Sequence, residues 1–285
     1  MRGLVLVLWS AGTYSLLALG IVLIYRTSRV LSLAQGELAI MLGYVCSTLL
    51  AIGLPLPVTV PAILLLSAGG GLLIYALIIR RVIAQPPFVA ILITVGLAIA
   101  LRALMVVLYE GRTARLDFGV VGGLTIAGER VSQVDLLSIA GTWGLVLVVS
   151  ATYMFSKIGM NMRAVAENPT LAAQRGVNVD FVVGSAWVVA VAGAAASGIF
   201  YGASSLLSTS APLIGVKAII AALIGGLDSL RGVVVGSLIV ATAEHLTIRL
   251  LTPQYLDLIP VLILLLILVI RPWGLFGTAE QVERV

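Results

Sequence analysis

Charged side chains inside apolar stretches are the first candidates for chemistry in this sequence. Glu37 and Arg102 each stand among aliphatic residues, and Asp228 lies three residues before Arg231 at a glycine-rich turn. Ionisable groups within a membrane are costly, so they are usually paired or line a path for ions or substrates. The Asp228/Arg231 spacing predicts a local ion pair. Glu37, in the first turns of its helix, can interact instead with the positive end of the helix dipole.

Motifs for covalent or metal chemistry are absent from the sequence. It has no P-loop and no HExxH pattern, and its lone histidine follows an acid as Glu244-His245, which we interpret as a satisfied polar patch rather than a proton-transfer pair. A single cysteine, Cys46, excludes an intrachain disulfide and a cysteine-based metal cluster. The sequence therefore predicts no catalytic residues, no ATPase site and no cofactor or metal bound by this chain.

The composition is that of a membrane protein. Of 285 residues, 61% are hydrophobic and only 10% are charged, and the mean hydropathy is +1.18; soluble domains carry about a quarter charged residues. Several apolar runs reach the roughly 20 residues that a spanning helix needs. The expected fold is all-α: one polytopic transmembrane domain over residues 1–285, with eight or nine hydrophobic segments. These are 3–25, 33–54, 58–79, 87–108, 136–155, 181–201, 213–223, 233–249 and 256–270.

Two of these segments have special features. Segment 213–223 is too short to span comfortably and ends at a glycine-rich turn, so we expect a half-helix or a re-entrant segment there. Segment 181–201 is rich in glycine, alanine and serine, which let helices approach closely in lipid, and we expect it at the centre of the bundle. The first apolar run is too long for a signal peptide and is interpreted as a retained span.

Basic residues indicate the orientation. They gather in alternate connectors, which places the N-terminus outside and the C-terminus in the cytoplasm. The connector 110–135 is then external, and residues 157–180 are cytoplasmic. Because Arg and Lys lie in short connectors rather than on one basic face, nucleic acid is not an expected partner. The residues on the cytoplasmic side are Arg26, Arg29, Arg80, Arg81, Lys157, Arg163, Arg175 and Arg271.

Residues 157–180 carry strong helix signals. Asn168 can cap a helix, Pro169 suits its first position, and Gly176 suits the position just past its end. Between them there is room for about two turns of helix. So short a helix between two spans buries no core of its own, which favours a docking element for a soluble partner; an ordinary loop with one helical turn is the alternative.

Two further caps are expected from local sequence. Ser32 begins Ser-Leu-Ala-Gln, a capping-box pattern with Gln35 at the third helical position. Asp180 is expected to cap the span that begins at Phe181.

Four stretches in order resemble one family. They are IYRTSRVLSLAQGELAIMLGYV (Ile24–Val45), IGMNMRAVAENPTLAAQRGVN (Ile158–Asn178), GVKAIIAALIGGLDSLRGVVVGSLIVATAEH (Gly215–His245) and RPWGLFG (Arg271–Gly277). The resemblance extends over nearly the whole chain, and these four stretches carry it. They resemble permease subunits of branched-chain amino acid ABC transporters of the high-affinity leucine, isoleucine and valine type, the "H" rather than the "M" subunit.

This resemblance implies a multi-pass permease of the bacterial inner membrane that forms half of a pathway for branched-chain amino acids. The implied partners are a second, homologous permease in a heterodimer, two cytoplasmic ATPase subunits that use ATP, a periplasmic or lipid-anchored binding protein, and membrane lipid. Urea, short amides and other amino acids remain alternative solutes, because Ser32-Leu33 replaces the family's Asn-Phe. An ion-coupled secondary carrier is the alternative from another class.

The resemblance also implies site residues. Residues 157–180 would hold the coupling segment, in which Leu171 replaces the family's acidic residue; the candidates are Arg163, Asn168, Pro169, Ala172, Ala173 and Gly176. The breaks near 26–37 and 225–232 would line the pathway, because exposed backbone at membrane depth needs cover or water. Backbone N–H groups at the first break can meet a substrate carboxylate. The pathway candidates are Gln35, Gly36, Glu37, Gly225 and Gly226.

Overall fold

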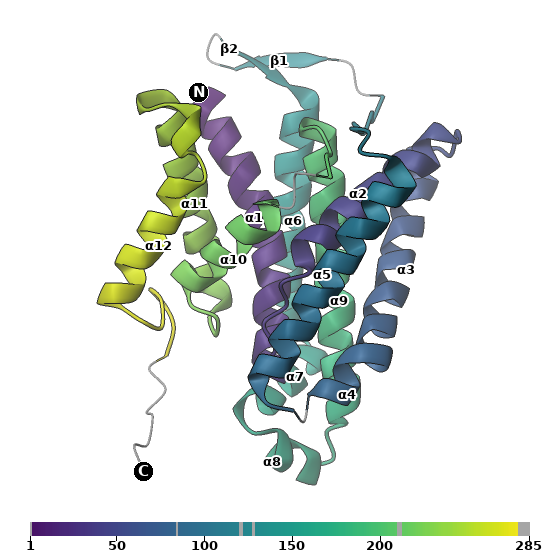
Figure 1. Ribbon diagram of the computed structural model, residues 1–285, viewed down its shortest axis with the longest axis vertical. Coiled ribbons are helices and arrows are strands. Elements are labelled where there is room, and N and C mark those ends of the chain that lie inside the picture. The colour runs from purple at the N-terminus through teal and green to yellow at the C-terminus, as the bar shows by residue number, and fades with distance from the viewer. Residues whose placement is uncertain (1, 84, 120–121, 127–128, 210–212, 279–285) are drawn as a thin grey trace.

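The computed structural model describes residues 2–83, 85–119, 122–126, 129–209 and 213–278 and is a bundle of helices (Figure 1). Within these residues, six helical stretches are long and apolar enough to cross a membrane, and three shorter apolar helices accompany them. The expected polytopic helical fold is thereby confirmed. The six are α1 (Arg2–Ser28), α3 (Leu56–Ile74) with its continuations η1 (Tyr75–Ile79) and α4 (Arg80–Val82), α5 (Pro87–Tyr109), α6 (Gln133–Phe155), α9 (Val179–Ser204) and α11 (Leu230–Leu250). The three are α2 (Gln35–Ala51), α10 (Leu213–Gly225) and α12 (Leu258–Ile270).

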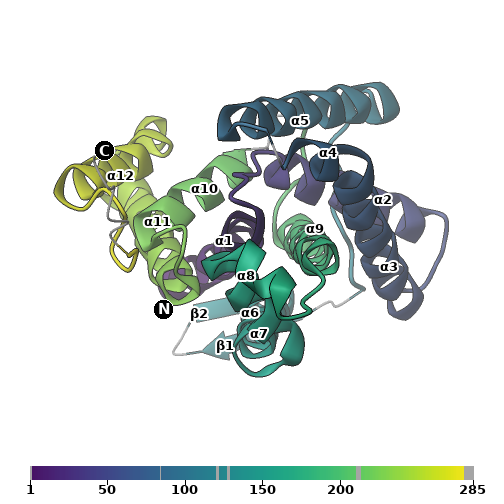
Figure 2. The ribbon, with the colours of Figure 1, turned by 90° about the horizontal axis from the view of Figure 1, so that it is seen from below.

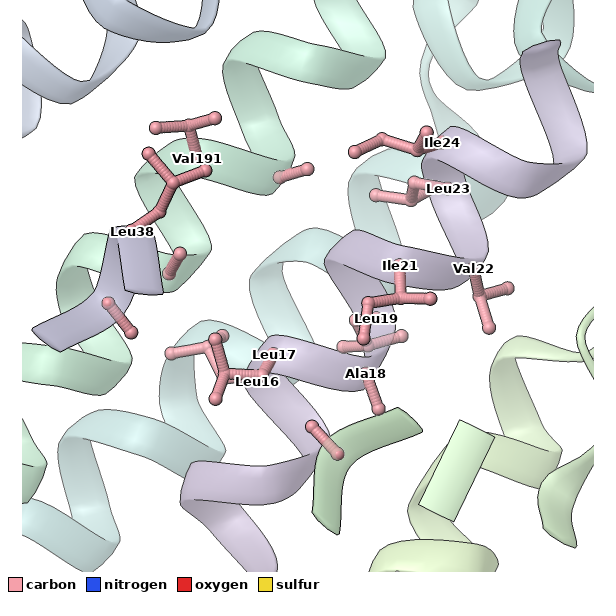
Figure 3. Close-up of a cluster of buried hydrophobic side chains, with 14 of the residues drawn as sticks. Leu16, Leu17, Ala18, Leu19, Ile21, Val22, Leu23, Ile24, Leu38 and Val191 are labelled. Atoms are coloured by element: carbon pink, nitrogen blue, oxygen red, sulfur yellow. The ribbon is translucent and has the colours of Figure 1, made fainter. Parts of the chain in front are cut away.

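The core lies around α1 and α9. Buried aliphatic side chains of α1 face Val191 of α9 and Leu38 of α2 (Figure 3). The two long helices approach closely where both carry small residues: a Cβ added at Gly20 would lie 3.1 Å from the Cα of Ala190. Since α9 also packs against α2, α3 and α6, the predicted central place of this small-residue span is confirmed.

The two ends of the bundle differ. One end carries the N-terminus and a hairpin of β1 (Gly123–Ile126) and β2 (Glu129–Ser132), antiparallel with Gly123 opposite Ser132 (Figure 1). The hairpin lies in the connector 110–135, where no strand was expected. The other end carries α4, α7 (Lys157–Glu167) and α8 (Pro169–Gln174).

Two predicted helix caps are wrong. α2 begins at Gln35 itself after Ala34, and its N-cap makes no side-chain hydrogen bond, so Ser32 forms no capping box. At α9 the cap is Asn178, whose Oδ1 accepts a hydrogen bond from the N–H of Phe181 at 3.0 Å. Asp180 instead accepts hydrogen bonds from Tyr75 Oη at 2.9 Å and Arg80 Nη2 at 2.7 Å, because its position in the first turn of α9 faces the end of the third span.

Candidate translocation pathway and coupling segment

Two helices begin inside the bundle. α2 starts after an irregular stretch that follows α1, in which Arg29 has a positive φ of 55°. α10 has 13 residues, or about 20 Å at 1.5 Å per residue, whereas a bilayer core is about 30 Å thick. The predicted half-helix is thus confirmed. The starts of the two helices touch: a Cβ on Gly215 would lie 2.8 Å from the backbone N of Gly36.

A cavity of about 510 Å³ opens beside this meeting point. Glu37 of α2 and Arg102 of α5 both line it, and Arg102 Nη2 lies 2.8 Å from Glu37 Oε1. The Glu37 side chain is 8% exposed and that of Arg102 is 52% exposed. The remaining lining is apolar or glycine: Leu33, Val95, Ala98, Ile99, Leu213, Gly215, Val216 and Ile219. Figure 2 shows α5 along the edge of the bundle, between α2 and α10 in that view.

Gln35 and Ser32 lie in or just before the first turn of α2. Gln35 is 1% exposed and Ser32 is fully buried, and neither side chain finds a hydrogen-bond partner among the described residues. Most buried polar groups in folded proteins are paired, so unpaired ones call for an explanation. Of the pathway candidates in the first turn of α2, Glu37 lines the cavity, and Gln35 and Gly36 directly precede it.

Gly225 and Gly226 lie elsewhere, at the far end of α10. The distance along the helix from Gly215 to Gly225 is about 15 Å. Both are buried: Gly225 packs on the backbone of Gly232 in α11, and Gly226, with φ of 106°, packs on Gly277. Their role on the pathway stays a prediction.

The chain segment after α12 caps the end of α10. The N–H of Leu275 donates to the carbonyl of Ile224 at 2.9 Å, and the N–H of Phe276 donates to that of Gly225 at 3.0 Å. Asp228 accepts hydrogen bonds from the backbone N–H and the hydroxyl of Thr278. The expected Asp228–Arg231 ion pair is therefore wrong: within the described ranges the two side chains form none, because the turn directs Asp228 to the tail.

A buried ion pair joins α10 to its neighbours. Lys217 Nζ lies 2.6 Å from Glu244 Oε1 on α11 and 3.2 Å from Asp257 Oδ1 before α12. Tyr14 of α1 donates its hydroxyl to Glu244 Oε2 at 2.7 Å. Glu244 is thus a satisfied group, as interpreted, but its partners are Lys217 and Tyr14. The sequence signal for this pair is the lysine within the otherwise apolar segment 213–223.

The candidate coupling segment, residues 157–180, contains two helices, α7 and α8, where one was expected. The predicted signals of α8 are confirmed: Asn168 Oδ1 accepts from the N–H of Leu171 at 3.0 Å, Pro169 begins the helix, and Gly176 ends it with φ of 82°. Ala172 is buried, whereas Ala173 and Leu171 are exposed.

Arg163 lies apart from that exposed surface. Its Nη1 donates to the carbonyl of Tyr153, and its guanidinium lies 5.5 Å from the centre of the Tyr153 ring, as Arg26 does at 5.4 Å. Arg163 therefore stabilises the junction of α6 and α7 from within the chain. Any contact between it and an ATPase stays a prediction.

Comparisons with known proteins agree on one family. The sequence model described as "Branched-chain amino acid transport system / permease component" matches residues 3–268. The high-affinity branched-chain amino acid transport system permease protein LivH of Escherichia coli K12 is 28% identical, over 96% of this chain and 94% of its own length. A probable branched-chain amino acid transport permease protein LivH of Methanocaldococcus jannaschii is 32% identical, over 92% of this chain and 88% of its own.

A solved structure supports the fold. A chain of the structure described as "PsaBC from Streptococcus pneumoniae in complex with Fab" superposes with a TM-score of 0.52 and 14% identity, over 93% of this chain and 91% of that one. Since the family model matches residues 3–268 and a relative is 32% identical over 92% of this chain, the chain belongs to the permease component family of branched-chain amino acid transport systems.

Proposed function

We propose that this chain is one of two permease subunits of an ATP-binding-cassette importer, and that it forms half of the pathway for branched-chain amino acids. The observation that carries the proposal is the exposed, separately capped α8 at one end of the bundle (Figure 1). A short helix with its own cap and stop can move as a unit, and exposed Leu171 offers an apolar anchor to a soluble subunit.

Motion of α8 would reach the pathway through packed helices. α7 and α8 pack on each other, and α7 contacts α1, α6 and α9, the helices of the core. Ala172 is buried at this joint. In this proposal ATP is bound and hydrolysed by cytoplasmic ATPase subunits, and this chain binds no cofactor of its own.

The orientation follows from the basic residues. Arg29 at the end of α1, Arg80 and Arg81 at α4, and Lys157 and Arg175 around α7 and α8 all belong to one end, which favours the cytoplasm for that end and the outside for the N-terminus. A cysteine at exposed position 171, in a Cys46→Ala background, should react with an impermeant thiol reagent only when the reagent has access to the cytoplasmic face. Labelling of intact cells from outside would reverse this orientation.

A second permease would cover the outer face of α5. Arg102 lies well inside this apolar helix, and its side chain is half exposed in the single chain. A guanidinium facing hydrocarbon costs several kcal/mol, so such residues face protein or a water-filled cavity. A homologous subunit packed on α5 and α10 would close the 510 Å³ cavity into a shared pathway.

Purification in mild detergent tests the assembly. We expect two P-loop ATPase subunits and a second hydrophobic subunit to co-purify with this chain, and the complex with its binding protein to accumulate leucine in liposomes only with ATP. Transport by the chain alone, driven by an ion gradient without ATP, would identify a secondary carrier. ATP-driven uptake of urea in place of leucine would keep the importer and replace the solute.

Gly176→Pro should uncouple ATP hydrolysis from uptake. Proline fixes φ near −65° and removes an N–H donor, whereas Gly176 has φ of 82° and donates its N–H to the carbonyl of Ala173 at 2.9 Å. The misfit should strain the end of α8 by more than about 1 kcal/mol and lower the leucine imported per ATP hydrolysed. Both rates are measured in the same liposomes.

A matched glycine provides the control. Gly119 in the connector at the opposite end also has a positive φ, 67°, and its N–H donates to Asp117 Oδ1 at 2.8 Å. Gly119→Pro should strain its loop equally and leave the leucine-to-ATP ratio unchanged. If Gly176→Pro and Gly119→Pro import the same amount of leucine per ATP hydrolysed, the result would count against docking at α8.

A further inference from the structure

We propose that the cavity between α2, α5 and α10 binds the charged ends of an α-amino acid, with Arg102 taking the carboxylate and Glu37 the ammonium group. This inference rests on the proposed transport function and adds the residues that select the solute. Glu37 and Arg102 are the two charged residues among those that line the cavity, and they lie 2.8 Å apart.

Charge balance favours a zwitterion over other solutes. An isolated buried charge is strongly unfavourable, but the Glu37–Arg102 pair is neutral as a whole. A zwitterion can enter this pair by exchange, so that each of the four charges keeps an opposite partner. A neutral solute such as urea cannot replace either partner, and an ion of net charge would leave one charge unpaired.

The two helix starts add donors for the carboxylate. The first N–H groups of a helix lack partners inside it and carry partial positive charge, which makes them a site for anions. α2 begins with Gln35 and Gly36, and Gly36 touches Gly215 near the start of α10. Both Glu37, in the first turn of α2, and Gly215, near the start of α10, line the cavity, so these two helix starts lie beside the proposed carboxylate position.

The rest of the cavity fits an aliphatic side chain. Its lining beyond the ion pair consists of leucine, valine, isoleucine, alanine and glycine, and its volume of about 510 Å³ is in the usual range for small-ligand sites. A polar side chain placed there would lose hydrogen bonds to water without replacement. The cavity thus offers one cation and one anion for the charged ends of an amino acid, together with apolar walls for a branched aliphatic side chain.

Arg102→Gln in the assembled importer tests the assignment. The variant keeps a polar side chain but loses the charge that holds the carboxylate. A charge-assisted hydrogen bond contributes about 1.5 to 3 kcal/mol, so leucine uptake should lose about tenfold to a hundredfold in kcat/KM. Arg112→Gln removes a comparable pair, 2.9 Å from Glu110 on the exposed connector, and should change uptake by less than about threefold.

A protection experiment separates recognition from damage to the fold. In a Cys46→Ala background, Ile99→Cys places a thiol on a lining residue that is 64% exposed. Leucine should slow the reaction of this thiol with a methanethiosulfonate reagent. Leucinamide lacks the carboxylate and should not slow it. In the Arg102→Gln variant, leucine should no longer protect the thiol.

The possible outcomes separate this binding assignment from the proposed transport function. If the assembled importer takes up leucine but leucine gives no protection, the cavity is not the binding site. If leucine gives equal protection with Arg102→Gln, Arg102 does not hold the carboxylate. In both cases the transport proposal stands. If the wild-type importer takes up no amino acid at all, the proposed solute fails together with this assignment.

Discussion

Lys217→Met is expected to destabilise the folded chain by about 3 to 5 kcal/mol, because it leaves a buried carboxylate without its cation. Lys217 Nζ lies 2.6 Å from Glu244 Oε1, and the two side chains are only 13% and 9% exposed. After the substitution, Glu244 keeps only the hydroxyl of Tyr14. The midpoint of denaturant unfolding in detergent micelles would measure the loss.

Two variants make this prediction specific. Lys157, the only other lysine of the chain, is exposed on α7, and Lys157→Met should change the free energy of unfolding by no more than about 0.5 kcal/mol. The double variant Lys217→Met, Glu244→Leu removes both charges and should recover much of the stability, since apolar replacements of buried pairs are often neutral. Equal losses in the single and double variants would show that the charge on Glu244 is not the cause.

Gly225→Ala is expected to destabilise the hairpin of α10 and α11 by about 1 to 3 kcal/mol and to abolish most uptake. A Cβ at this position would overlap the carbonyl of Gly232 and lie 2.7 Å from the backbone N of Val233. Backbone atoms cannot turn aside as a flexible side chain can, so the helices must separate. The separation would also strain the hydrogen bonds by which Leu275 and Phe276 cap α10.

A glycine on another helix of the bundle supplies the comparison. Gly144 on α6 has open space where a Cβ would go, and Gly144→Ala should be neutral or slightly stabilising, because alanine is a better helix former than glycine. Unfolding midpoints and leucine uptake would be measured for both variants. Equal behaviour of the two would show that the contact with Gly232 is not limiting.

Several features that depend on local sequence were predictable, although the caps assigned to Ser32 and Asp180 were wrong. The lengths of the apolar runs predicted the membrane spans. Asn168, Pro169 and Gly176 predicted the capped helix α8, because these residue types favour particular backbone geometries at helix ends. The half-helix α10 followed from a segment too short to cross a bilayer. Small residues along α9 indicated its central place, because close helix packing needs them.

Features that depend on distant contacts were not predictable. Glu37 and Arg102 were recognised as unusual, but their pairing joins two helices 65 residues apart in sequence. Lys217 meets Glu244 because α10 and α11 pack side by side in a hairpin. Hydrophobic periodicity does not show which residues of two such helices face each other. Asp228 was assigned to the nearest opposite charge, whereas a tail that returns from α12 supplied Thr278.

The cap on α10 has a consequence for the order in which the protein is made. The carbonyls of Ile224 and Gly225 accept from Leu275 and Phe276, which leave the ribosome only after α11 and α12. Until then these carbonyls must be hydrated or held by the insertion machinery, because unpaired backbone is not tolerated in hydrocarbon. The end of α10 is therefore completed only after residues 275 and 276 have been added, and a chain interrupted before residue 275 leaves both carbonyls without these donors.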